Sequence, residues 1–171
     1  MLTRLIRVFG LLIGAAWMGE VLFGNLGDTA LFGNFRTYHL QAYRAIGWSF
    51  IGSAVGFTVL AGLMAAYRTG GFRKAVLASA LSGLVSGVIV LTGVMAMEVF
   101  FHRALRQSPS VLSDFARSGQ RDLSMYMYGE AFVGGIAHVL IGPALGVTVG
   151  AIGAAIGMLV RRLRFSMAAI S

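Results

Sequence analysis

The sequence predicts an all-α integral membrane protein: a four-helix bundle with a short extramembrane amphipathic helix between its third and fourth spans. Three observations lead to this fold class. Of the 171 residues, 57% are hydrophobic and 12% are charged, about half the charged fraction of a typical soluble domain. The charges gather at the ends of long apolar runs. The last run, between Glu130 and Arg161, lacks Asp, Glu, Lys and Arg, and as a helix it would reach about 45 Å, more than a bilayer's hydrocarbon core.

We therefore interpret residues 1–171 as a single transmembrane domain with spans at about 5–24, 45–67, 75–101 and 129–160. The first span has Arg4 and Arg7 at its start and carries Glu20 as its only charge after Arg7. A basic start before an apolar run also suits a signal peptide. No small-x-small cleavage site precedes a polar region, so we keep this segment as a membrane helix.

Glycine spacing in the other spans predicts close helix packing. Small residues four apart form a flat face on a helix, where another backbone can approach. The glycines at this spacing are Gly52 and Gly56 in the second span, Gly83 and Gly87 in the third, and Gly142, Gly146 and Gly150 in the fourth. The last three form a stripe of the glycine-zipper type, and we expect Pro143 to kink this helix locally.

The segment from Arg103 to Tyr128 is the one extended polar stretch. Its Ser-Pro-Ser at 108–110 is typical of a helix start, and Gly119 is expected to end that helix. Val111, Leu112 and Phe115 are expected to share one side. Such a helix can lie on the membrane surface or cap the bundle, and the sequence leaves both open.

The net charge of +8 predicts a membrane partner and no nucleic acid, because the basic residues stand in small groups at the helix ends. With four spans, both termini lie on one side. That side would hold Arg4, Arg7, Arg68, Arg73, Lys74, Arg161, Arg162 and Arg164. The opposite side would hold Arg36, Arg44, Arg103, Arg106, Arg117 and Arg121. The first set includes a dense short turn, so we expect both termini in the cytoplasm of a bacterium, with the spans in its inner membrane.

Five ionisable side chains are expected at similar depth near the end opposite the termini. They are Glu20, Glu98, His102, Glu130 and His138. Ionisable residues inside a membrane are costly, so this polar cluster is a candidate ion, proton or metal site. The alternative is that Glu98, His102 and Glu130 lie at the interface and pair with nearby arginines. The sequence requires no cofactor and leaves the metal unknown. The absence of cysteine excludes thiolate ligands, disulfides and thiol nucleophiles.

Residues 47–145 resemble a bacterial four-span membrane family that is known as a domain of unknown function. The similarity lies in the basic turn at 67–74, in Glu98 to Phe101 at the end of the third span, in Asp114 and Phe115, and in Glu130. The resemblance implies the four-span topology and no particular activity.

The leading functional interpretation is a non-enzymatic accessory or scaffold subunit of a membrane assembly, or a homo-oligomer. Its partners would be the lipid bilayer and other membrane subunits or copies of itself. One alternative is a proton- or cation-coupled small transporter that uses Glu20 with Glu98, Glu130 and His138. A second alternative is a metal- or haem-binding membrane enzyme built on the same side chains.

Overall fold

The computed structural model describes residues 1–168, and this part of the chain forms helices and no strand. The elements are α1 (Leu2–Leu26), the 3-10 turn η1 (Ala30–Phe32), α2 (Phe35–Tyr38), α3 (Leu40–Thr69), α4 (Phe72–Leu105), α5 (Pro109–Ser118) and α6 (Leu123–Ala168). Helices α1, α3, α4 and α6 are long and apolar enough to cross a membrane. The expected all-α membrane bundle of four long helices is therefore confirmed.

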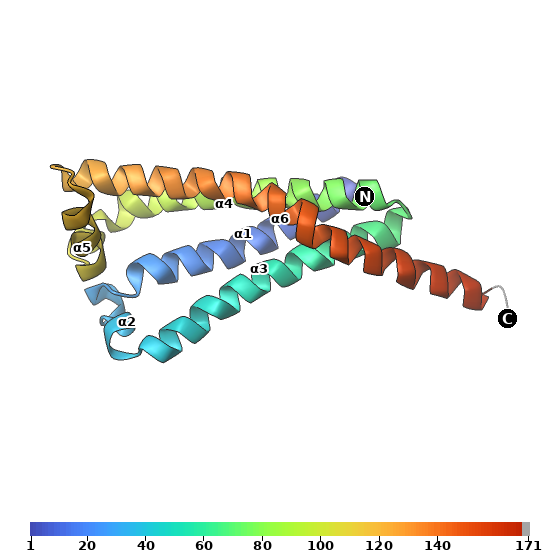
Figure 1. Ribbon diagram of the computed structural model, residues 1–171, viewed down its shortest axis with the longest axis horizontal. Helices are drawn as coiled ribbons and strands as arrows, with labels where there is room; N and C mark the ends of the chain where they lie inside the picture. Colours follow the sequence, from blue (N-terminus) through green and yellow to red (C-terminus); the bar gives the residue numbers. More distant parts are fainter. Residues whose placement is uncertain (169–171) are drawn as a thin grey trace.

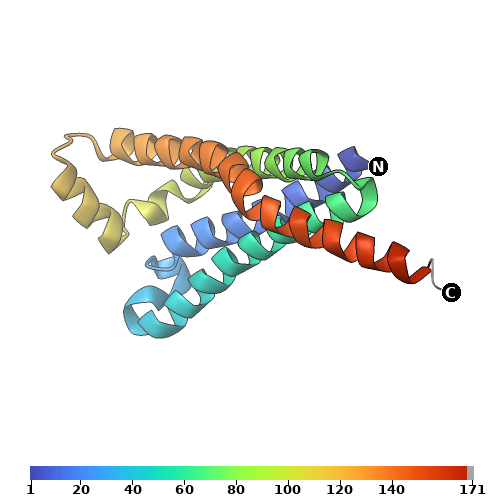
Figure 2. The ribbon, with the colours of Figure 1, turned by 45° about the vertical axis from the view of Figure 1, so that its right-hand side comes forward.

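The long helices pack as a bundle in which α6 is central. Helix α4 lies along the first part of α6, and α3 lies along its later part, while α1 contacts both α3 and α4. Figures 1 and 2 show that α6 changes direction about midway, in the stretch whose colour corresponds to residues near 140. Pro143 lies inside this helix, where it lacks the N–H of a regular backbone bond, so the bend agrees with the expected kink.

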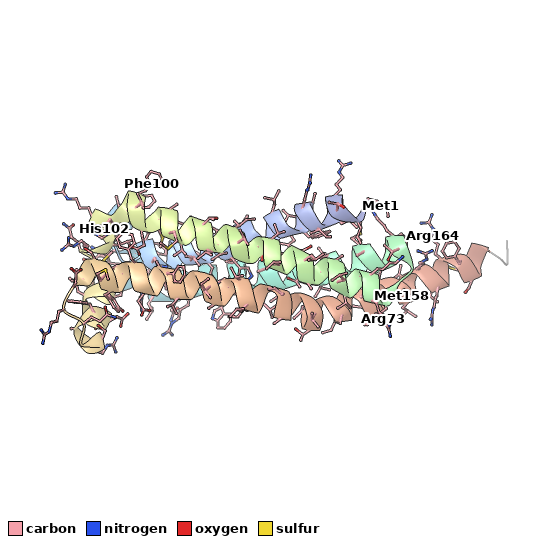
Figure 3. All side chains as sticks on the ribbon, turned by 90° about the horizontal axis from the view of Figure 1, so that it is seen from above. Met1, Arg73, Phe100, His102, Met158 and Arg164 are labelled. Carbon is pink, nitrogen blue, oxygen red and sulfur yellow. The ribbon has the colours of Figure 1, made fainter. Side chains whose placement is uncertain are left out.

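Both termini lie at one end of the bundle, and α5 lies at the other (Figure 1). In Figure 3, Met1, Arg73 and Arg164 mark the first end, which we call the basic end, and Phe100 and His102 mark the second, the α5 end. Arg161 donates a hydrogen bond to the Tyr67 carbonyl oxygen in the last turn of α3. This arginine thus satisfies a carbonyl that the end of α3 leaves free.

The long helices spread apart toward the α5 end (Figures 1 and 2), and the size of the core side chains changes in the same direction. At the basic end the buried core is mostly alanine: Ala65, Ala66, Ala75, Ala78 and Ala154 with Leu5. At the α5 end it contains larger side chains: Val21, Leu26, Val90, Val94, Met97, Leu105 and Met127 with Ala131. Small side chains let backbones approach closely, and larger ones hold them apart.

The glycine stripe of α6 meets other helices of the same chain. A Cβ atom at Gly83 would overlap the carbonyl oxygen of Gly142, and one at Gly62 would overlap that of Gly150. Gly146 lies against the backbone of α4 at Ser79 and Ala80. By contrast, an added Cβ at Gly52 or Gly56 would meet no heavy atom within 4 Å. Glycines with the same spacing thus have different surroundings in α6 and in α3.

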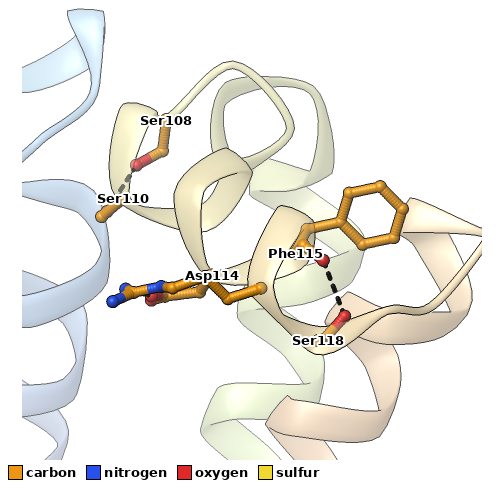
Figure 4. A network of polar contacts seen from close by, with 6 residues as sticks. Ser108, Ser110, Asp114, Phe115 and Ser118 are labelled. Carbon is orange, nitrogen blue, oxygen red and sulfur yellow. Dashed lines mark hydrogen bonds and ion pairs between the residues drawn. The ribbon is translucent and has the colours of Figure 1, made fainter.

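Helix α5 follows the expected boundaries and packs against the bundle. Ser108 precedes its first turn, and Gly119 ends it in the left-handed conformation, with φ of 70°, which glycine adopts without strain. Figure 4 shows this helix, with Ser118 hydrogen-bonded to the Phe115 carbonyl oxygen. The Phe115 ring lies 5.6 Å from that of Tyr126 in α6.

One side of α5 differs from expectation. Val111 packs against the core of the α5 end, whereas Leu112 is 44% exposed and does not share that inward face. The contacts of Val111 and Phe115 favour the second of the two placements that the sequence left open, a helix that caps the bundle.

Candidate functional site

A pocket of about 300 Å³ lies at the α5 end, where the long helices diverge. It is bounded by α1, α4, α5 and α6. Its wall consists of Val21, Asn25, Val90, Val94, Met97, Glu98, Val111, Asp114, Tyr126, Met127, Glu130, Ala131, Gly134, Gly135 and His138. Three carboxylates and one imidazole stand in this wall, and no lysine or arginine does.

Glu98 is the most buried ionisable residue of the wall, with 6% of its surface exposed. Its Oε2 atom is inaccessible and has no hydrogen-bond partner. The Nδ1 atom of His102, one helical turn further on, lies 3.9 Å from Oε2. That distance is too long for a hydrogen bond. Glu98 therefore places a carboxylate in an apolar core, and one of its two oxygen atoms accepts no hydrogen bond within residues 1–168.

His102 lies behind Glu98 and outside the pocket wall. Its Nδ1 atom is buried without a hydrogen bond, and its Nε2 atom lies 3.4 Å from the Ser124 hydroxyl of α6. The ring stacks on Tyr128, with the ring centres 5.6 Å apart. His102 thus lies between the buried carboxylate and the partly exposed start of α6.

Glu130 and His138 both reach the pocket from α6. Glu130 is exposed and stands at the rim. The Nδ1–H of His138 donates to the Gly134 carbonyl oxygen at 2.9 Å, within its own helix, because a carbonyl can only accept. The imidazole edge also contacts Trp17 of α1, with ring centres 5.5 Å apart.

Glu20 is not part of the pocket wall, although it lies within electrostatic range of His138. It lines a smaller hollow between α1 and α3, of about 120 Å³, together with Tyr43, Arg44 and Trp48. No hydrogen bond or ion pair to Glu20 is found within residues 1–168. Of the five side chains expected in one cluster, the structure brings Glu98, Glu130 and His138 to one pocket, places His102 beside Glu98, and puts Glu20 in a separate hollow.

Asp114 also lies in the pocket wall, although the polar cluster expected from the sequence did not include it. It comes from α5, three residues after Val111, and both side chains reach the pocket because residues three apart share a helix face. Asp114 also forms an exposed ion pair with Arg117. The spacing of Val111 and Asp114 was a signal for this placement, but the sequence left open whether α5 meets the bundle.

The side chains of the pocket do not form a metal centre of ordinary composition. Among residues 1–168, no three or more His, Cys, Asp or Glu side chains are grouped closely enough to hold a metal ion. The wall combines one buried carboxylate with rim carboxylates and apolar side chains. Such a wall complements a positive charge that needs few polar ligands.

No protein-family model, curated protein or solved structure matches the chain. The fold and the pocket together define a helical membrane protein with an acidic pocket at one end of its bundle.

Proposed function

We propose that this protein binds a cation in the pocket at the α5 end and couples that binding to transport across the membrane. The observation that carries the proposal is Glu98, a carboxylate in the pocket wall with 92% of its side chain buried and with no hydrogen bond to its Oε2 atom within residues 1–168. Leaving a buried polar atom unpaired costs about 1–3 kcal/mol, so a purely structural residue at this position would be a poor choice. A cation bound in the pocket would instead balance the charge of the Glu98 carboxylate, which lies in the pocket wall.

The absence of lysine and arginine from the wall supports the same conclusion. An anion would face Glu98 and Glu130, and the wall offers it no cationic side chain. This proposal follows the transport alternative raised by the sequence, with Glu98 in the central role instead of Glu20. It does not require a metal cofactor.

A flux assay in liposomes tests the transport proposal. The protein is reconstituted around a pH-sensitive dye, and sodium, potassium or a small organic ammonium salt is added outside. We expect protein-dependent exchange for one class of cation, slowed about tenfold or more in Glu98→Gln, because a contact to a charged group is worth about 1.5–3 kcal/mol. Asp122→Asn removes an exposed carboxylate outside the pocket wall, so it is the matched control and should retain the flux. Equal rates in wild type and a folded Glu98→Gln variant would refute the proposal.

We also propose that the chain lies in the inner membrane of a bacterium with both termini in the cytoplasm, because the basic end carries more lysine and arginine than the α5 end. A reporter fused after Arg164, or inserted in the turn at 69–71, should then behave as cytoplasmic. A reporter near Ser118 should behave as external. An external reporter after Arg164 would mean that the orientation is inverted.

A second candidate function, an accessory subunit or a self-associating scaffold, is favoured by one face of α3. Gly52 and Gly56 stand four apart, and a Cβ added at either would meet no heavy atom within 4 Å among residues 1–168. In membranes, such a pair suits close contact with a helix of another chain. We expect Gly56→Leu to reduce co-migration with partner subunits or copies in mild detergent and to leave cation flux unchanged. Unaltered migration would show that this face contacts lipid.

A further inference from the structure

We propose that the pocket at the α5 end takes an organic monocation, an ammonium group joined to a small apolar body. This inference rests on the cation-binding function proposed above and names its ligand class. It is argued from the charges in the wall, the apolar surface beside them and the size of the pocket.

The charges favour a ligand with one positive charge. Glu98 is the one carboxylate that lies deep in the wall, with 92% of its side chain buried. The other two carboxylates lie at the rim: Asp114 is half exposed and already paired with Arg117, and Glu130 is exposed. Water screens both, so neither demands a second charge on the ligand. One buried negative charge is matched by one positive charge.

The wall around Glu98 favours an organic group over a metal ion. Val90, Val94 and Met97 stand beside it on α4, and Met127 and Ala131 face them from α6. A hard metal ion needs about six oxygen ligands, whereas an ammonium group needs far fewer, because methyl or methylene groups spread its charge and suit apolar walls. Tyr126 adds an aromatic ring to the wall, a surface that attracts ammonium groups.

The size of the pocket limits the apolar body. About 300 Å³ is the lower end of the range for small-molecule sites. A benzyl or short branched alkyl group with its ammonium head fits such a volume. The ammonium group would lie against Glu98, and the apolar body would lie along the valines and methionines.

Equilibrium dialysis of the purified full chain in mild detergent tests this inference, with radiolabelled benzyltrimethylammonium as the probe. We expect saturable binding at one site per chain. Benzyl alcohol, which has the ring but no charge, should displace the probe poorly, as should sodium and magnesium chloride at the same ionic strength. Glu98→Gln should weaken binding about 10- to 100-fold. Asp122→Asn removes a nearby exposed charge outside the wall and should bind normally.

A second variant keeps the test decisive if Glu98→Gln folds poorly. Gly134 lines the pocket, and an added Cβ there would meet nothing within 4 Å, so a side chain can start at this position and Gly134→Phe is chosen to fill the pocket. We expect this variant to fold and to lose the probe. Unchanged affinity in Gly134→Phe, or equal displacement by benzyl alcohol, would overturn the inference.

The outcomes also separate this inference from the transport proposal. Displacement of the probe by sodium or magnesium, dependent on Glu98, would overturn the organic ligand and leave cation transport standing. Flux of an inorganic cation without probe binding would likewise overturn the organic ligand and support cation transport. Probe binding that depends on Glu98, with no flux of any cation, would support the ligand class and refute transport.

Discussion

Gly83→Ala is expected to destabilise the bundle by about 1–3 kcal/mol, the range for overpacking a well-packed interior. The added methyl group would overlap the carbonyl oxygen of Gly142, and a Cβ at Gly142 would in turn overlap that of Gly83. Both obstacles are backbone atoms, so no side-chain rotation can relieve them. Helices α4 and α6 would have to separate at this contact. The measurement is the apparent unfolding temperature in detergent, followed by circular dichroism.

Gly129→Ala is the matched control for this prediction. Gly129 also lies inside a helix, and a Cβ there would meet nothing within 4 Å. The same change should therefore be neutral or stabilising, because alanine favours a helix over glycine by up to about 1 kcal/mol. The two substitutions are expected to shift the unfolding temperature in opposite directions. A shift of the same sign and size in both would mean that α4 and α6 are not in backbone contact at Gly83.

Glu98→Met is expected to stabilise the protein while abolishing binding of the cationic probe. The methionine side chain is close in length and fills the space with apolar atoms. The substitution removes a buried oxygen that has no hydrogen-bond partner. In the wild type, that unpaired oxygen costs about 1–3 kcal/mol of stability. The measurement is again the unfolding temperature, taken without ligand, together with probe binding by dialysis.

Glu130→Met makes the same substitution at an exposed position in the same wall. It should change stability by no more than about 0.5 kcal/mol, as surface substitutions usually do. A clear loss of stability in Glu98→Met would instead show that Glu98 holds His102 in place, which is a structural role. Higher stability with lost binding would identify Glu98 as a residue kept for its ligand.

The sequence was sufficient to predict the four membrane helices, because absence of charge over a long run is a direct consequence of the bilayer. Gly119 as the end of α5 and the bend of α6 followed from the backbone properties of glycine and proline. Residue patterns were less informative about which partner each face meets. Gly142 and Gly52 belong to runs with the same four-residue spacing, yet only the first lies against another helix of the chain.

The candidate site shows the same limit. Position along a span indicates the depth of a side chain but not the direction in which it points around the helix axis. Glu20 and Glu98 were expected at similar depth, yet Glu20 lies in a hollow between α1 and α3, whereas Glu98 lies in the pocket beside α6. Asp114 joins the pocket only because α5 packs on α6, a tertiary contact that no local pattern specifies.

A crystal structure with 4-bromobenzyltrimethylammonium tests the central claim most directly, because the bromine atom gives an anomalous signal that locates the ligand. The account predicts a bromine peak within the pocket at the α5 end, among Val94, Met97 and Met127, with the ammonium group against Glu98. A bromine peak elsewhere on the chain, with an empty pocket at Glu98, would contradict it.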